Sequence, residues 1–186
     1  MTDYSLTTAL DRWIAAHMES VHTCIPAIVE SYEGHETRKA TITPHINFWS
    51  VGGMQAEFPP IAGVPVMFPS SKTFNFVFEL SPGDTGLLFF TECALGNWLD
   101  GNGAEPVAPE DTTRFSLADA VFIPGLWPFG AVPVTDAPAK GAQISYKGAK
   151  VSFNEDETLS IADGKGNTIA TSASSITING NFEVLQ

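Results

Sequence analysis

The sequence contains few basic residues, and this scarcity restricts its possible partners. Its 186 residues include 9 Lys and Arg against 21 Asp and Glu, which gives a formal net charge of -12 at pH 7. A surface of this charge repels phosphate backbones and supplies none of the counterion release that strengthens nucleic-acid binding. We therefore expect no DNA or RNA partner.

Cysteines are also scarce. The two in the chain, Cys24 and Cys93, are too few for a disulfide scaffold and lack the CxxC or Cys/His spacing of a zinc site. We expect both to be buried, reduced thiols, with a disulfide between them as the less favoured alternative.

Signals for export or membrane insertion are missing as well. The segment MTDYSLTTALDRW lacks the basic start and the unbroken apolar run of a signal peptide. No stretch approaches the 18 or so apolar residues that a membrane-spanning helix needs. The sequence predicts a protein that is made and first folded in a cytoplasm.

Catalytic and metal-binding motifs are absent in the same way. There is no GxSxG, HExxH or Walker motif, and no pair of carboxylates stands out as a general acid and base. The loop around Asp100, Asn102 and Glu105 is acidic and Gly-rich, as calcium loops are, but it lacks their D-x-N-x-D-G pattern and closing Glu. We expect no enzymatic activity, no metal and no other cofactor.

The histidines fit the same interpretation. The nearest pair, His17 and His22, is five residues apart, and this spacing does not place both on one helix face. We expect surface or capped core positions for all four: His17, His22, His35 and His45.

What the sequence does contain favours β structure. Hydrophobic residues make up 44% of the chain, enough for a core, and there are 13 Phe, 16 Gly and 13 Pro but few helix-like runs. This composition is typical of a mainly β protein with many turns.

One helix is predicted in the N-terminal segment, residues 1–22. Apolar residues recur there with the spacing of one helix face, namely Leu6, Leu10, Trp13, Ile14, Met18 and Val21. Ser5 is a suitable N-cap, and the pattern predicts a helix over residues 6–20. We expect the stripe to pack on the protein core; the alternative is that it docks on another subunit.

Residues 23–130 are predicted to form a small closed barrel. They contain short strand-like runs bordered by turn residues: CIPAIVESYEG, RKATITPHINFW, PPIAGVPVMFP, TFNFVFEL, TGLLFFTECA and FSLADAVFIPG. The stretch Ser81–Asp84 has Pro and Gly where a type II turn prefers them, and residues 100–111 read as a surface loop. The expected core includes Phe74, Phe76, Phe78, Leu88 and Phe90.

A proline-rich connector is predicted at residues 131–142, and a different pattern follows it over 143–186. That tail consists of strand-sized pieces separated by polar or Gly corners: QISYK, AKVSF, TLSIA, NTIAT, SITI and FEVLQ. It has no large aromatic cluster to form a core of its own, whereas several identical chains wound about one axis would pair their edges and bury their apolar strips together. We expect a homotrimer whose core contains Ile144, Val151, Leu159, Ile161, Ile169, Ile176, Ile178, Phe182 and Val184.

Two stretches, SPGDTGLLFFTECALGNWLDGNG and TTRFSLADAVFIPGL, followed by the connector and the corner-punctuated tail, resemble the central spike proteins of contractile phage tails. The resemblance covers residues 24 to about 130, and the tail matches in style. It implies an oligomer-binding-type (OB) barrel under the tail hub and an intertwined three-chain β-helix that acts as a membrane-piercing needle. It also implies a location in the virion tail baseplate, after assembly in the host cytoplasm.

The sequence departs from this family in two respects. Larger members carry a lysozyme domain between barrel and needle, for which residues 130–142 leave no room. Shorter needles often end in a His-x-His metal site, but no histidine follows His45. Because the last residues are apolar and lack such a tip, we expect a separate small tip protein to cap the needle; the alternative is that the polar Gln186 and disorder of the last few residues suffice to solvate the end.

Two other classes of function fit the sequence less well than the spike. An OB nucleic-acid or ligand-binding module would need basic residues interleaved with exposed aromatics, and the charge has the wrong sign. A cell-wall hydrolase would need a cleft-forming domain with a catalytic carboxylate, for which the chain has no space. The sequence therefore predicts a structural spike whose partners are copies of itself, the tail hub and the host cell envelope.

Overall fold

The computed structural model describes residues 6–19, 21–49, 53–131, 138 and 140–180. The chain divides into two compact units, Met1–Pro128 and Phe129–Gln186. Across both units the protein is mainly β, with two helices among the described residues. This confirms the predicted class.

Helix α1 spans Leu6–Glu19, close to the predicted bounds. Its apolar side chains do not pack on the core, so that expectation is wrong: Leu6, Leu10, Trp13, Ile14 and Met18 are all at least half exposed. The physical reason is that the strands of the first unit and the segment between β5 and β6 already supply the whole buried cluster, and α1 contributes no residue to it.

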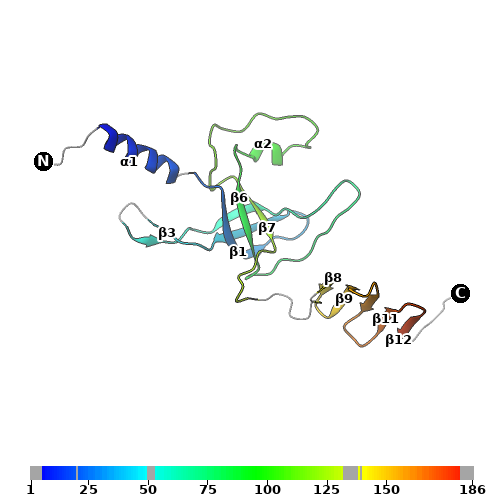
Figure 1. The fold of residues 1–186 in the computed structure, drawn as a ribbon. Coiled ribbons are helices and arrows are strands. Elements are labelled where there is room, and N and C mark those ends of the chain that lie inside the picture. The colour runs from blue at the N-terminus through cyan, green and yellow to red at the C-terminus, as the bar shows by residue number, and fades with distance from the viewer. Residues whose placement is uncertain (1–5, 20, 50–52, 132–137, 139, 181–186) are drawn as a thin grey trace. The chain divides into compact units, whose positions relative to one another are not determined.

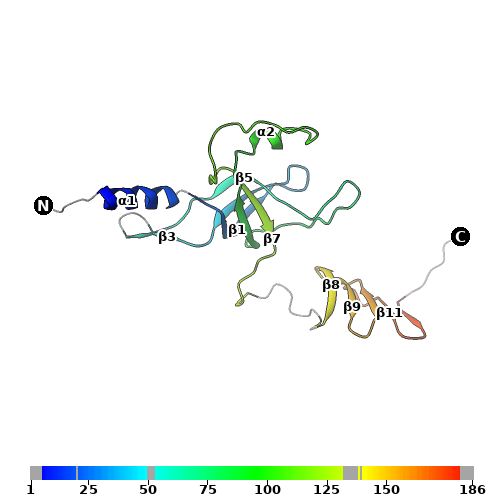
Figure 2. The ribbon, with the colours of Figure 1, turned by 45° about the horizontal axis from the view of Figure 1, so that its top comes forward.

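The first unit is built on a five-stranded antiparallel sheet in the order β5-β2-β1-β6-β7. The strands are β1 (Cys24–Tyr32), β2 (Lys39–Pro44), β5 (Ile61–Pro65), β6 (Thr85–Phe90) and β7 (Ala120–Pro124). The register shifts between Val29 and Ser31 on β1, and between Ala40 and Ile42 on β2. Such irregularities bend strands, and the sheet is curled into a half-barrel (Figures 1 and 2).

The two edge strands of this sheet approach each other. Val66, directly after β5, forms a parallel bridge with Phe122 on β7. The Met67 N–H donates to the Phe122 carbonyl at 2.9 Å. The curled sheet is therefore partly closed on itself at this edge.

The core fills the inside of the curl with side chains that alternate along each strand. Its buried members are Ala27, Val29, Ala40, Ile42, Val64, Val66, Phe68, Leu80, Leu88, Phe90, Ala120 and Phe122. Phe122 is completely buried, and Gly86 makes room for it: a Cβ atom on Gly86 would lie 2.6 Å from the Phe122 ring. Successive side chains along each strand thus lie alternately on the inner and the outer face of the sheet.

The predicted barrel core is only partly correct. Leu88 and Phe90 are buried, and Phe78 packs partly buried against the cluster. Phe74 and Phe76 are exposed, and TFNFVFEL is not a strand of the sheet. The reason is a local turn: the Ser71 N–H donates to the Phe74 carbonyl at 2.6 Å, so this backbone pairs with itself rather than with the sheet.

Shorter elements connect the strands. β3 (Phe48–Trp49) and β4 (Gln55–Ala56) pair with each other, which shows that RKATITPHINFW is two strands rather than one. Helix α2 (Gly96–Leu99) precedes the exposed loop at 100–111. The type II turn is confirmed, because the Asp84 N–H donates to the Ser81 carbonyl at 3.0 Å and Gly83 has φ +96.

Both cysteines are free and exposed, so the prediction that they are buried is wrong. Cys24 lies on β1 with the opposite parity to Ala27 and Val29, and therefore faces away from the core. Cys93 follows the end of β6, in a bend of the chain.

The second unit is a five-stranded antiparallel meander in the order β12-β11-β10-β9-β8 (Figure 1). Its strands are β8 (Gly141–Tyr146), β9 (Ala149–Asn154), β10 (Leu159–Ala162), β11 (Thr168–Thr171) and β12 (Ile176–Asn179). These correspond to the first five predicted pieces. The sixth piece, FEVLQ, and most of the predicted connector lie outside the described residues.

Candidate functional site

An apolar surface covers one face of the second unit's sheet. Strand pairing places Ile144 opposite Val151, Val151 opposite Ile161, Ile161 opposite Ile169, and Ile169 opposite Ile178. Directly opposite residues share a face, so these side chains form one row across all the strands of the sheet, here called the apolar row. Residues two positions away on the same strands widen this face: Ala142, Tyr146, Phe153, Leu159 and Ile176.

The apolar row is largely open to solvent in the single chain. Ile144 is 55% exposed, Ile178 48% and Ile169 41%. Burial of apolar surface stabilises by roughly 25 cal/mol per Å². A contiguous exposed face of this kind marks an interaction surface.

The opposite face of the same sheet is small and polar. One row across it consists of Gln143, Ser152, Ser160, Ala170 and Thr177. Ser152 is buried, and its hydroxyl donates to Oε1 of Gln143 at 3.3 Å. All buried hydrophobic residues of the described chain belong to the first unit. A single copy of the second unit therefore shows no hydrophobic core among its described residues.

The structure brings most of the predicted needle-core residues together on the apolar face: Ile144, Val151, Leu159, Ile161, Ile169, Ile176 and Ile178. The other two, Phe182 and Val184, lie outside the described residues. Alternation in the sequence identified the members of this face. Their alignment into a row was missed, because it depends on the strand register set by the corners.

Hydrogen-bonded aspartates shape two of the corners. Asp163 accepts from Nδ2 of Asn167 at 2.6 Å and from the Lys165 N–H at 2.7 Å, and the Asn167 bond is the main reason why the pKa of Asp163 is lowered. Asp156 accepts from the Thr158 hydroxyl at 2.6 Å, which lowers the pKa of Asp156. These carboxylates hold turns. No group of three or more His, Cys, Asp or Glu side chains in the described part of the chain is placed to hold a metal ion.

Helix α1 carries a second exposed apolar surface. Leu6 is 77% exposed, Met18 63% and Trp13 60%. None of the helices that the structure describes has the length and apolar character needed to cross a bilayer.

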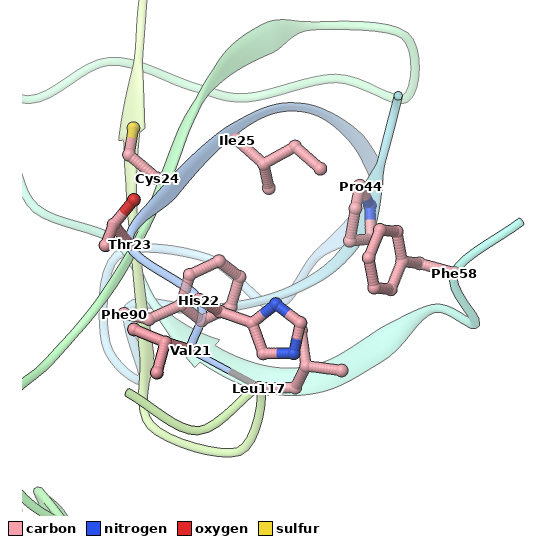
Figure 3. Close-up of a pocket in the computed structure, with 9 residues that line it drawn as sticks. All are labelled: Val21, His22, Thr23, Cys24, Ile25, Pro44, Phe58, Phe90 and Leu117. Carbon is pink, nitrogen blue, oxygen red and sulfur yellow. The ribbon is translucent and has the colours of Figure 1, made fainter. Parts of the chain in front are cut away.

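A small hollow lies beside Val21, His22 and Thr23, where the chain enters β1 (Figure 3). Its volume is about 160 Å³, and it is lined mainly by apolar side chains, with the His22 ring 5.8 Å from Phe58 and 5.5 Å from Phe90. Pockets for small ligands usually measure roughly 300–1,000 Å³. The hollow is therefore a poor candidate for a cofactor or substrate site.

The predicted polar candidates are not brought together. His17 contacts Trp13 on the helix, whereas His22 contacts the aromatic rings of the first unit. In the loop at 100–111, the side chain of Asn102 accepts from the N–H of Ala104, as in a simple turn. The described geometry thus adds no catalytic or metal-binding arrangement to these residues.

Exposed aromatic residues in the first unit were missed by the sequence analysis. Phe74 is 60% exposed on the segment between β5 and β6, and Trp49 is 70% exposed on the short strand β3. Both belong to runs that alternate like strands, so the residue pattern alone contains no signal that separates them from core positions.

Comparison with known proteins bears on the first unit. The family model described as phage protein Gp138 N-terminal domain matches residues 25–125, which is more than half of the chain. The match spans the curled sheet from β1 to β7. No curated protein matches the chain.

Proposed function

The chain belongs to the phage protein Gp138 N-terminal domain family, and on this premise we propose that it is the central spike of a contractile phage tail. In this proposal it is a structural component of the virion, located in the tail baseplate. It helps to puncture the host cell envelope during injection and has no enzymatic activity.

The first unit would be the collar of the spike. Its strand order, β5-β2-β1-β6-β7, together with the parallel approach of Val66 to Phe122, supports a five-stranded, partly open barrel of the OB type. A partly closed sheet of this kind has its own core and can be held on the tail axis by the hub proteins.

The second unit would be the needle, and the apolar row is the observation that carries this proposal. A five-stranded meander that exposes Ile144, Ile161, Ile169 and Ile178 on one face needs a cover. Three copies wound about a common axis would bury this face at the centre and leave polar side chains outside. Such a needle suits axial load, because many interstrand hydrogen bonds must break together before it buckles. Contraction of the tail sheath would supply the force.

The alternative, an OB module that binds nucleic acid or a small ligand, has less support. The net charge of -12 opposes binding to phosphate backbones. The hollow beside His22 is about 160 Å³, smaller than usual ligand pockets.

The proposal is tested on the full-length chain and on phage particles. Sedimentation equilibrium at micromolar concentration should give a trimer. Cryo-EM of intact particles should show three copies on the tail axis at the baseplate, and contracted particles should release dye from liposomes made of host envelope lipids. A stable monomer, or a particle without this chain at its tail axis, would contradict the proposal.

A further inference from the structure

The apolar stripe of α1 has the spacing of a helix-to-helix seam. Leu6, Leu10, Trp13 and His17 are separated by four, three and four residues, which is the alternation of a and d positions in a heptad. All four side chains of this seam are exposed in the structure, and none belongs to the buried core. The seam therefore needs a partner.

The positions beside the seam are small or apolar. Ala9, Ile14 and Ala16 flank it, whereas Asp11 and Arg12 fall at heptad positions that point away from it. Identical helices can therefore pack side by side without bringing like charges together. A face this wide suits a bundle of more than two helices better than a narrow two-stranded seam.

The side chain of His17 is held beside the ring of Trp13 on this face. The two ring centroids are 4.0 Å apart, and Nδ1 of His17 donates to the Trp13 carbonyl at 2.9 Å. The carbonyl can only accept, so the proton is on Nδ1. The two rings together form one broad aromatic surface at the second half of the seam.

The segment that follows the helix is hydrogen-bonded to the stretch of chain before β7. The Val21 N–H donates to the Met18 carbonyl at 3.2 Å, and the His22 N–H donates to the Phe115 carbonyl at 3.2 Å. Only a short link separates α1 from this anchor. If three copies are joined elsewhere, the tether keeps their helices at a high effective concentration.

A membrane surface fits α1 less well. Helices that lie on membranes usually carry several Lys or Arg on the polar face, and Arg12 is the only such residue in Leu6–Glu19. The net charge of -12 further opposes binding to anionic lipids.

We propose that the α1 helices of three copies of this chain pack in parallel along the Leu6, Leu10, Trp13 and His17 seam. This contact between the chains is separate from the one through the apolar row. The inference rests on the proposed function, because the number of three copies comes from the trimer proposed there. A helix of 14 residues is about 21 Å long, too short to associate stably in isolation. The bundle forms only on chains that are already joined.

Cysteine crosslinking of the full-length protein tests this inference. In a Cys24→Ser, Cys93→Ser background, Leu10→Cys places a thiol in the seam, and Ala15→Cys places one on the opposite side of the same helix. Mild oxidation should link chains through Leu10→Cys several-fold more than through Ala15→Cys. Equal linkage at both positions, or none at either, overturns the inference.

Two further measurements separate this inference from the proposed function. A trimer by sedimentation without linkage at Leu10→Cys overturns the helix bundle and leaves the spike intact, whereas a monomer overturns the spike. Flotation with vesicles of neutral lipid, or with added anionic lipid, tests the membrane instead. Binding that is lost in Leu10→Glu, with no linkage at Leu10→Cys, would assign α1 to the membrane and overturn the bundle.

Discussion

Gly148 and Gly164 lie backbone against backbone at two corners on the same side of the β8–β12 sheet. A Cβ atom on Gly164 would lie 2.6 Å from the carbonyl carbon of Gly148, closer than such contacts occur. Gly164 also has φ +73, a backbone conformation that residues with a side chain rarely adopt. The absence of a side chain at this position lets one corner stack directly on the next, so the glycines set the spacing of the corners.

We expect Gly164→Ala to destabilise the second unit. The positive φ alone costs roughly 1–2 kcal/mol for a residue with a Cβ, and the contact with Gly148 adds to it. Thermal unfolding of the full-length protein by circular dichroism measures the loss.

Gly166→Ala is the matched control for this corner. Gly166 has φ +103, but a Cβ atom there would meet nothing within 4 Å. It should therefore lose only the φ contribution. Equal losses for Gly164→Ala and Gly166→Ala would show that the two corners do not press on each other.

Charge in the apolar row should weaken association of the chains. Ile144→Asp places a carboxylate on the face that the proposed trimer buries, and burial of an unpaired charge is costly, so we expect association at least about 100-fold weaker. Ser145→Asp adds the same charge to the other face of the same strand, at an exposed position. Sedimentation equilibrium compares the two. Dissociation by both variants, or by neither, would contradict burial of this face.

The features that were predictable from the sequence are those that depend on a few adjacent residues. The turn at Ser81–Asp84 forms as predicted because Pro82 and Gly83 restrict the backbone locally. Helix α1 and the strands of the tail follow from side-chain periodicity in the same way.

Features that depend on residues outside the segment itself were not predictable. The run from Thr73 to Leu80 alternates like a strand, yet the local turn at Ser71 and Phe74 removes it from the sheet. Cys24 lies in a strand-like run with hydrophobic residues, but its place in the alternation along β1 puts its side chain on the outer face of the sheet. A prediction of the apolar row would need the register of all the strands from β8 to β12, and no single segment encodes that register.

Phe122→Ala should lower the free energy of unfolding of the first unit. Its ring is completely buried at the centre of the core cluster, and removal of a buried Phe side chain costs about 3–5 kcal/mol. Phe74→Ala removes the same group from an exposed position, so its loss should be much smaller. Urea unfolding followed by circular dichroism gives both values. A comparable cost for the two variants would contradict the described core.

Acid should weaken the corner that Asp163 holds. The hydrogen bond from Asn167 lowers the pKa of Asp163 below its ordinary value of 3.8. A group with a lowered pKa in the folded state stabilises the fold above its unfolded pKa, and this contribution is lost as the pH falls through the folded pKa. Asp163→Asn should therefore lower the thermal midpoint at pH 7 and have little effect at pH values well below 3.8. Asp100→Asn, which removes an exposed carboxylate from the first unit, is the control for charge alone. Losses for Asp163→Asn that are the same at both pH values would show that the ionised carboxylate does not hold this corner.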